Sequence, residues 1–237
     1  MQLFYSPNLT VNDTKLVFSK EESRHIAKVL RKEIGATLYL TDGKGYAYTA
    51  MLESNNPKQC IATITEISEK TPLPYKLHMA VAPTKLNDRF EWFLEKATEI
   101  GIHEITPILC NHSERKVIKL ERYEKIIQSA AKQSLKYFFP ILNPMCSFKD
   151  FITNYKNNPS QKLIAHCEET EKQPLKSQII AKGNHIIMIG PEGDFSKQEI
   201  SIACANNFIA TSLGASRLRT ETAAIVACHS VAFSNEL

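Results

Sequence analysis

The sequence predicts an α/β protein with a small β-rich domain at residues 1–70 and a larger domain with a parallel sheet at residues 75–237. In the first part, short runs rich in β-branched and aromatic residues lie close together, which is typical of a compact barrel. In the second part, short apolar runs alternate with helical patterns, which is typical of parallel strands connected by helices. A chain of 237 residues with 43% hydrophobic residues is long and apolar enough to form both cores.

The first domain is predicted to combine one helix with several strands. The capping-box pattern Ser19-Lys20-Glu21-Glu22 predicts the start of a helix that runs to about Arg31, and Gly35 is expected to follow its end. Prolines and charged residues interrupt both periodicities at residues 69–74, so the domain boundary is predicted there. Strands are predicted at residues 37–41, 46–52 and 59–67, the first two joined by a turn at residues 42–45.

In the second domain, strands and helices are predicted to alternate. A helix at residues 88–100 carries an apolar stripe and is closed by Gly101, and a helix at residues 119–137 turns its basic residues outward. This alternation predicts a parallel sheet with helices on both faces. The other expected elements are strands at residues 77–82, 104–109, 163–167, 185–189 and 208–213, and a short helix at residues 174–181.

Basic residues are concentrated in parts of an otherwise balanced chain. Residues 112–140 hold seven basic and three acidic side chains, an excess equal to the formal net charge of the whole chain, +4. Basic residues also fall on one face of the helix predicted in the first domain. Such patches favour a nucleic-acid partner, and a solvated helix face is the alternative explanation. The candidate RNA contacts are Arg24, Lys28, Arg31, Arg115, Lys116 and Lys136.

The cysteines and the apolar runs indicate the kind of environment in which the chain works. Six cysteines are scattered along the sequence without zinc-site spacing, so we expect reduced, structural thiols and no metal site. No apolar run approaches the length of a membrane span, and the first residues do not form a signal sequence. A cytoplasmic protein is therefore expected.

Two loop sequences near the end of the chain have the features of a ligand site. Residues 188–195 and residues 212–223 each follow an apolar run that predicts a buried strand, and each precedes a predicted helix. The first of these helices has the capping-box pattern Ser196-Lys197-Gln198-Glu199, and Thr220 is expected to cap the second. Ligands of open α/β sheets bind outside the carboxyl ends of the strands, so both loops are expected at one site.

The glycines of the first loop fit either a binding loop or a simple turn. Gly190 and Gly193, two residues able to adopt positive φ angles, flank Pro191-Glu192, and such a loop is expected to present its amides outward. A strand-to-helix turn that needs glycine only for its geometry is the alternative. Neither phosphate-loop pattern, G-x-x-x-x-G-K-[ST] or G-x-G-x-x-G, occurs in the chain, which argues against an enzyme acting on nucleoside triphosphates.

These motifs resemble those of the bacterial 16S ribosomal RNA uridine-N3 methyltransferase family, which belongs to the knotted SPOUT methyltransferases. The resemblance is carried by Ile189-Gly190-Pro191-Glu192-Gly193, by Leu213-Gly214 followed by Leu218-Arg219-Thr220-Glu221-Thr222-Ala223, by residues 96–101 and by Gln133-Ser134. The N-terminal part, with His25 and Leu30-Arg31, is similar to the family's PUA-like RNA-binding barrel. The family usually has a second glycine where this chain has Asp194, and an arginine where it has Lys136.

The resemblance implies a C-terminal α/β-knot (SPOUT) domain that binds S-adenosyl-L-methionine without a metal, and a homodimer that acts on 16S ribosomal RNA of the small subunit. The implied cofactor contacts come from three loops of the knot. They are Ile164, His166, Ile189, Gly190, Pro191, Glu192, Gly193, Leu213, Gly214, Ser216, Leu218, Thr220 and Ala223.

Methylation of uridine N3 requires stabilisation of a negative charge, because the nitrogen becomes nucleophilic only as its proton leaves. Arg219 is the expected cation beside the charged oxygens, and Glu221 the expected proton acceptor. A structural role of both residues in holding the loop is the alternative. Two alternative functions are a knotted methyltransferase acting on tRNA or on a ribose 2'-oxygen, and a non-catalytic RNA-binding protein of the same fold.

Overall fold

The computed structural model describes residues 2–236, and the chain divides into two compact units. The first unit contains the chain up to Pro72 together with Ala131–Phe139, and the second contains Leu73–Ala130 and the chain from Pro140 onward. The short segment Ala131–Phe139 therefore belongs with the N-terminal unit, a placement that the sequence pattern did not predict. Within residues 2–236, no helix combines the length and the apolar character that crossing a membrane requires.

The first unit is built on a five-stranded sheet that forms a half-barrel, as the PUA-like prediction expects. The neighbouring strands pair in the order β1, β3, β4, β5, β2, and all pairs are antiparallel except β1 with β3. Alternate residues of β3 and β4, such as Leu38, Leu40 and Tyr48, are buried in its core, because successive side chains of a strand point to opposite faces. The strands are β1 (Leu3–Tyr5), β2 (Lys15–Val17), β3 (Thr37–Thr41), β4 (Tyr46–Ser54) and β5 (Ile61–Glu69).

The helix of the first unit is shorter than predicted. Helix α1 (Lys20–Arg24) begins at Ser19, whose side chain accepts a hydrogen bond from the amide of Glu22, and it continues as the π-helical turn η1 (His25–Val29). The prediction that the helix runs to about Arg31 was wrong, because Arg31 has a φ of 51° and lies beyond the end. The side chains of Arg24, Lys28 and Arg31 are nevertheless all exposed.

The segment Ala131–Phe139 joins the first unit through backbone and side-chain contacts. Helix α3 (Leu120–Gln133) ends earlier than the predicted residue 137, because Leu135 adopts a positive φ of 55°. Beyond it, the amide of Phe139 donates to the carbonyl of Gly43, and the ring of Phe139 stacks on Tyr5 at 4.5 Å between centroids. These contacts link Phe139 to residues about 96 and 134 positions away, which no local pattern in the sequence could predict.

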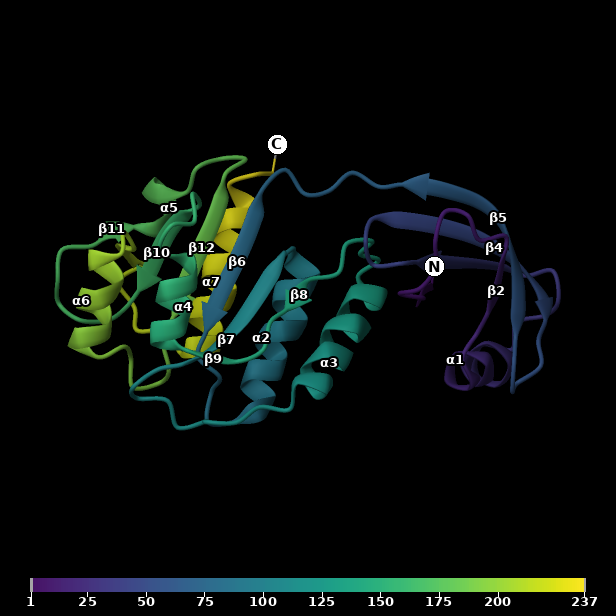
Figure 1. Ribbon diagram of the computed structural model, residues 1–237, viewed down its shortest axis with the longest axis horizontal. Coiled ribbons are helices and arrows are strands. Elements are labelled where there is room, and N and C mark those ends of the chain that lie inside the picture. Colours follow the sequence, from purple (N-terminus) through teal and green to yellow (C-terminus); the bar gives the residue numbers. More distant parts are fainter. Residues whose placement is uncertain (1, 237) are drawn as a thin grey trace. The chain divides into compact units, whose positions relative to one another are not determined.

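The second unit contains the predicted parallel sheet, in the strand order β11, β13, β10, β12, β6, β7, β8. Figure 1 shows β10, β12, β6 and β7 of this sheet side by side. All of its neighbouring strands are parallel, and the short strand β9 (Cys146–Ser147) also pairs with β7. The strands are β6 (Lys76–Val81), β7 (Glu104–Leu109), β8 (Ile141–Leu142), β10 (Gln161–Ala165), β11 (Gln173–Pro174), β12 (Asn184–Ile189) and β13 (Ile209–Ser212).

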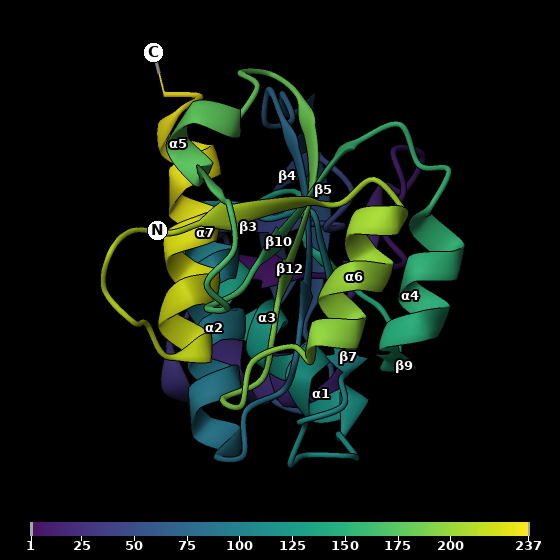
Figure 2. The same ribbon diagram turned by 90° about the vertical axis from the view of Figure 1, so that its left-hand side faces the viewer.

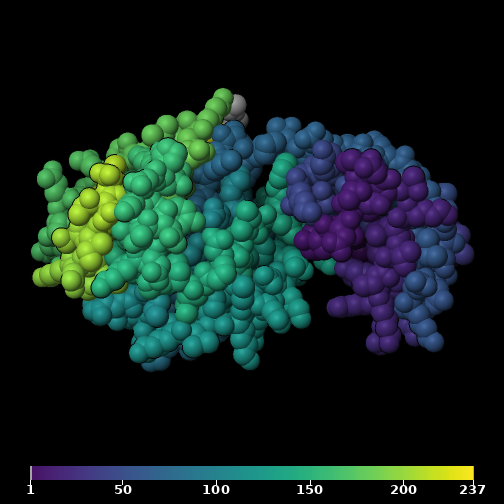
Figure 3. Space-filling model, in the orientation of Figure 1, coloured from purple at the N-terminus to yellow at the C-terminus, as the bar shows by residue number. Residues whose placement is uncertain are grey.

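Helices cover both faces of this sheet, and each face has its own hydrophobic core. Leu163 and Ile187 point to one core, which also takes residues of α2, α5 and α7. Ile164 and Met188 point to the other core, which takes residues of α4 and α6. Figure 2 shows these two groups of helices on opposite sides of β10 and β12, and Figure 3 shows α4 and α6 side by side at the surface. The helices are α2 (Asn87–Ile100), α4 (Phe148–Tyr155), α5 (Leu175–Gln178), α6 (Lys197–Ala205) and α7 (Thr220–Phe233).

The strand order of the second unit shows the threading expected of a knotted domain. Strands β10 and β11 are connected by residues 166–172, yet β13 lies between them in the sheet. The chain enters β13 from α6 on one face and leaves it toward α7 on the opposite face. The C-terminal segment therefore passes between two strands that an earlier loop connects, in contrast to the unknotted connections of most proteins.

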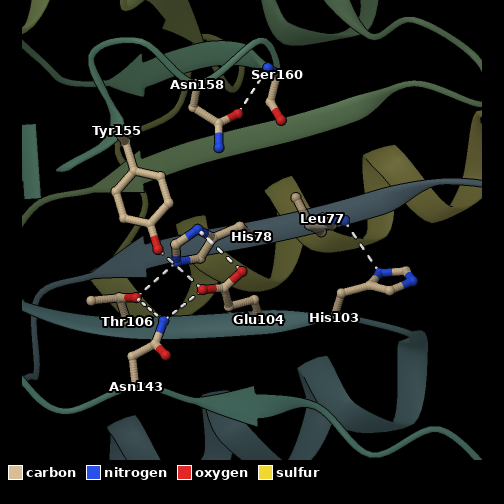
Figure 4. A network of polar contacts seen from close by, with 9 residues as sticks. All are labelled: Leu77, His78, His103, Glu104, Thr106, Asn143, Tyr155, Asn158 and Ser160. Atoms are coloured by element: carbon tan, nitrogen blue, oxygen red, sulfur yellow. Dashed lines mark hydrogen bonds and ion pairs between the residues drawn. The ribbon is translucent and has the colours of Figure 1, made fainter.

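A buried polar network fastens the amino ends of β6 and β7 (Figure 4). His78 lies 2.7 Å from the hydroxyl of Thr106 and 3.7 Å from the carboxylate of Glu104. Asn143 and Tyr155 both donate hydrogen bonds to Glu104, at 2.7 and 3.1 Å. Burial lowers the pKa of His78 to about 4, although the nearby Glu104 opposes the shift, so the imidazole is neutral in the folded protein.

Candidate functional site

A cavity of about 920 Å³ opens at the carboxyl ends of β10, β12 and β13. Its walls come from three loops that follow these strands, as expected for a ligand site of an open α/β sheet. The first loop contributes residues 165–169 and Lys172, the second residues 189–194, and the third residues 211–220, with Ala223 from the first turn of α7. The structure thus brings together at one cavity the two glycine loops and the segment after β10.

Most of the predicted cofactor contacts line this cavity, and one does not. Ile164 is fully buried in the core beneath α4 and α6, so its predicted contact with the cofactor was wrong; the next residue, Ala165, lines the cavity instead. Successive residues of a strand alternate between faces, which explains this one-residue error. The predicted contacts that line the cavity are His166, Ile189, Gly190, Pro191, Glu192, Gly193, Leu213, Gly214, Ser216, Leu218, Thr220 and Ala223.

The glycines of the β12–α6 loop serve close packing and not an unusual backbone angle. Neither Gly190 nor Gly193 uses the positive φ angles that glycine can adopt. A Cβ atom on Gly190 would lie 3.1 Å from the amide nitrogen of Phe195, and one on Gly193 would lie 2.9 Å from Cβ of His112. Side chains larger than hydrogen therefore do not fit at either position without displacing the loop.

Hydrogen bonds from two other segments hold the β12–α6 loop. The amide of Lys85, which follows β6, donates to the carboxylate of Glu192 at 2.9 Å. The hydroxyl of Thr220, at the start of α7, donates to the carbonyl of Gly190 at 3.1 Å. Thr220 was expected to cap α7, but it is the first helical residue, and the N-cap position is taken by Arg219, without a side-chain cap. Its hydroxyl connects the two glycine loops instead.

His166 lines the cavity, and the nitrogens of its polar ring are buried. Its side chain is 7% exposed, and within residues 2–236 neither ring nitrogen has a hydrogen-bond partner. Burial is the main reason that the pKa of His166 is lowered, with a further contribution from Lys172. A neutral imidazole can both donate and accept, so a bound ligand with hydroxyl or amine groups would satisfy it.

Charged side chains lie at the third loop and in the adjoining helix. Arg217 and Arg219 line the cavity and are exposed, and the guanidinium of Arg219 has no hydrogen bond or ion pair with any residue in the range 2–236. Glu221, in contrast, is 7% exposed, does not line the cavity, and has Oε1 3.8 Å from Nε of Arg89 in α2. The two residues predicted to act together thus face different surroundings.

Arg115, one of the predicted RNA contacts, makes hydrogen bonds within the protein. The Arg115 guanidinium donates hydrogen bonds to the carbonyls of Thr84 and Lys85, at 2.9 and 2.6 Å, so it holds the loop that follows β6. Lys116 is exposed, and Lys136 is half-buried within the first unit. In the described part of the chain, no group of three or more His, Cys, Asp or Glu residues is arranged to hold a metal ion.

Several cavity residues could not be found from sequence motifs. The segment 167–169 and Lys172 carry no glycine pattern or capping signal, and their position depends on the crossing of the chain around β13. Asp194 was noted only as a departure from a family pattern, yet its side chain accepts a hydrogen bond from the amide of Cys167 at 2.7 Å. The resemblance to knotted proteins was the available signal for the first loop.

Comparison with known proteins agrees with this arrangement. An RNA methyltransferase domain family matches residues 71–232, and an RNA methyltransferase PUA domain family matches residues 18–65. The chain is 32% identical to ribosomal RNA small subunit methyltransferase E of Mesomycoplasma hyopneumoniae, with 94% of this chain and 90% of that protein covered.

Two solved structures resemble the whole chain. The crystal structure of a "probable rRNA-methyltransferase" from Porphyromonas gingivalis has 38% sequence identity and a TM-score of 0.88, covering 98% of both chains. Ribosomal RNA small subunit methyltransferase E from Neisseria gonorrhoeae, solved bound to S-adenosyl methionine, has 29% identity and a TM-score of 0.83, covering 96% of this chain and 95% of that one. The chain therefore belongs to the RNA methyltransferase family, together with ribosomal RNA small subunit methyltransferase E.

Proposed function

We propose that this protein transfers a methyl group from S-adenosyl-L-methionine to N3 of a uridine in 16S ribosomal RNA of the small subunit. The observation that carries the proposal is the cavity formed by the three loops after β10, β12 and β13. The Neisseria gonorrhoeae relative, which shares the fold of the whole chain, was solved with S-adenosyl methionine bound. The names of the relatives support ribosomal RNA as the substrate and, by their family, uridine N3 as the target.

The cavity fits the methyl donor in size and in chemistry. Its volume of about 920 Å³ is within the range of pockets that enclose a small molecule. The buried imidazole of His166 can bind a hydroxyl or amine group, because both of its ring nitrogens lack a hydrogen-bond partner within residues 2–236. When bound, the donor supplies a methyl group already activated by a sulfonium, so the protein mainly aligns the reactants and stabilises charge.

Arg219 is the residue we propose for charge stabilisation. As the N3 proton leaves, negative charge spreads onto O2 and O4 of the base, and a cation beside these oxygens lowers the energy of that state. Arg219 lines the cavity and is exposed. Its guanidinium has no protein partner within residues 2–236, so it can approach a base placed at the cavity mouth.

For Glu221 the geometry favours a positioning role over proton transfer. A proton acceptor must come within hydrogen-bond reach of N3, directly or through one water. Glu221 is buried outside the cavity lining, and its carboxylate faces Arg89. We propose that the Glu221–Arg89 pair fixes the first turn of α7 against α2. Rescue of Glu221→Gln turnover at high pH would instead support the direct proton acceptor.

We further propose that the protein works in the cytoplasm as a homodimer. Trp92 of α2 is 44% exposed and Phe233 of α7 is 65% exposed, and these two helices pack against each other in the second unit. Such exposed apolar side chains on adjoining helices are typical of an interface between copies. RNA is proposed to bind the exposed residues Arg24, Lys28 and Arg31, together with Lys116 and Lys136.

The direct test compares possible substrates. Purified protein and donor labelled on the methyl group are incubated with assembled small ribosomal subunits, with naked 16S ribosomal RNA and with tRNA. We expect incorporation into the small subunit or its RNA and not into tRNA. Equal or greater incorporation into tRNA would contradict the proposed substrate, and donor binding without any transfer would support the non-catalytic RNA-binding protein.

A further inference from the structure

The side chain of Asp194 links two of the three loops that form the cavity. Its Oδ2 accepts a hydrogen bond from the amide of Cys167 at 2.7 Å, although the two residues are 27 positions apart. Its Oδ1 accepts from the amide of Phe195 at 2.8 Å, which orients the carboxylate. The segment that follows β10 is therefore tied to the loop that follows β12.

Asp194 makes this link from a backbone conformation that favours glycine. Its φ is 63°, in the left-handed region, where aspartate is tolerated better than most residues but glycine is unstrained. Glycine at this position would ease the backbone, but it would remove both carboxylate contacts. The presence of a side chain under strain indicates that its contacts compensate for that strain.

The bond to Cys167 acts on the peptide group that connects it to His166. The carbonyl oxygen of the same peptide group, that of His166, accepts a hydrogen bond from Nζ of Lys172 at 3.0 Å. One charged side chain thus holds the N–H of the His166–Cys167 peptide and another holds its C=O. This peptide directly follows His166, whose buried ring lies in the cavity wall.

The backbone of Asp194 is held as well. Nδ1 of His112, just after β7, lies 3.0 Å from the carbonyl oxygen of Gly193 and 3.1 Å from that of Asp194. An Nδ1–H group there donates to both carbonyls. The carboxylate that restrains the His166–Cys167 peptide is therefore itself anchored to the sheet through a third segment.

We propose that Asp194 is a positioning residue that, together with Lys172, clamps the His166–Cys167 peptide and so pre-forms the cavity for the methyl donor. The inference rests on the proposed function, because it takes this cavity as the donor site. Holding the segment in its bound conformation removes an entropy loss that binding would otherwise incur, so the clamp increases donor affinity. It touches no reacting atom and should leave the transfer step itself unchanged.

The test replaces Asp194 by the residue that suits its backbone best. For Asp194→Gly we expect Kd and KM for S-adenosyl-L-methionine to rise about tenfold, as loss of a hydrogen bond to a charged group predicts, with kcat at saturating donor within about twofold. The thermal unfolding midpoint of Asp194→Gly should fall by no more than that of the control variant Asn207→Gly, since glycine relieves the backbone strain at both positions. Asp194→Asn keeps one acceptor and should give an intermediate Kd, and Lys172→Met should also raise Kd.

The matched control is Asn207→Gly. Asn207 has a φ of 66°, is exposed, and lies after α6 and outside the cavity lining, so this change relieves the same backbone conformation without altering the clamp. Amide exchange by NMR gives a readout independent of activity: the Cys167 amide should exchange faster in Asp194→Gly and not in Asn207→Gly.

Two outcomes would overturn the clamp. One is unchanged donor affinity with unchanged Cys167 exchange in Asp194→Gly, and the other is a loss of kcat equal to the rise in KM. Gly190→Val separates this failure from failure of the proposed function. If Gly190→Val abolishes donor binding while Asp194→Gly does not weaken it, the cavity is the donor site and only the clamp is wrong. If the unmodified protein binds no donor, the proposed function itself fails.

Discussion

The hydroxyl of Thr220 donates a hydrogen bond to the carbonyl of Gly190, 3.1 Å away, and this bond joins the two glycine loops of the cavity. Thr220 is 5% exposed and is the first residue of α7, the helix that packs on α2. The shape of the cavity is therefore coupled to the packing of the second unit's core.

Replacing Thr220 by valine should affect both stability and donor binding. Valine has nearly the same shape, so the change removes the hydroxyl and leaves the buried Gly190 carbonyl without this donor, at a cost of about 1–2 kcal/mol in the free energy of unfolding. Urea denaturation and calorimetric titration with S-adenosyl-L-methionine measure the two effects. Thr222→Val, two residues further along α7, is the matched control, and an equal loss in both variants would contradict the role of the hydroxyl.

Replacing Arg219 by alanine should lower turnover and leave donor affinity unchanged. Because the guanidinium is proposed to stabilise charge that develops only during the reaction, kcat should fall by a factor of roughly 100 to 1,000. Single-turnover methylation of small subunits and equilibrium binding of the donor separate the two effects. Arg217→Ala removes a neighbouring cavity charge and serves as control. Near-normal turnover of Arg219→Ala would remove the residue from the mechanism, and lost donor binding would favour a structural role.

Three basic residues of the first unit should contribute to RNA binding through phosphates. Replacing Arg24, Lys28 and Arg31 by glutamine removes three exposed positive charges. The negative slope of log K for RNA binding against log salt concentration should therefore become smaller in magnitude by about two to three. Filter binding of 16S ribosomal RNA at several salt concentrations measures this slope, and donor affinity should not change.

A triple variant in the second unit removes the same charge and serves as the control. It replaces the exposed residues Lys149, Lys156 and Lys176 by glutamine. If this variant flattens the salt slope as much as the N-terminal variant does, the first unit is not the part of the protein that docks RNA.

The buried His78 should make stability depend on pH on the acidic side. Its pKa is lowered from the ordinary 6.5 to about 4 in the folded protein, so the unfolded chain takes up the proton first as the pH falls. Stability should be complete above about pH 6.5 and be lost progressively as the pH falls toward 4, by roughly 2 kcal/mol between pH 7 and pH 5. Urea midpoints across this range should show a smaller loss in His78→Gln. An equal loss in both proteins would show that other groups are responsible.

The sequence predicted the larger domain better than the details of its site. Alternating apolar runs correctly indicated the parallel strands, because burial on both faces produces continuous hydrophobic segments such as Ile186 to Ile189. Gly190 and Gly193 line the cavity, but a Cβ atom on Gly193 would meet His112, which is 81 positions away along the chain and is brought near by no local pattern. Close approach of distant segments cannot be predicted from spacing along the chain.

Three further features depend on contacts between distant parts of the chain. The segment Ala131–Phe139 follows a helix of the second unit yet joins the first, where Phe139 stacks on Tyr5. Arg115 was predicted from its charge to contact RNA, and the packing of the chain adds contacts of its guanidinium with the carbonyls of Thr84 and Lys85. Glu221, expected beside Arg219, pairs with Arg89. Sequence patterns identify charged residues, whereas their partners are determined by how the elements pack.

Nucleoside mass spectrometry of the RNA product tests the central proposal most directly. Small subunits that lack the modification are incubated with the protein and methyl donor, the RNA is digested, and the modified nucleoside is compared with standards. The predicted result is uridine methylated on N3, at one site in 16S ribosomal RNA, and strongly reduced with Arg219→Ala. A product methylated on the ribose 2'-oxygen or on a carbon of the base would contradict the proposal.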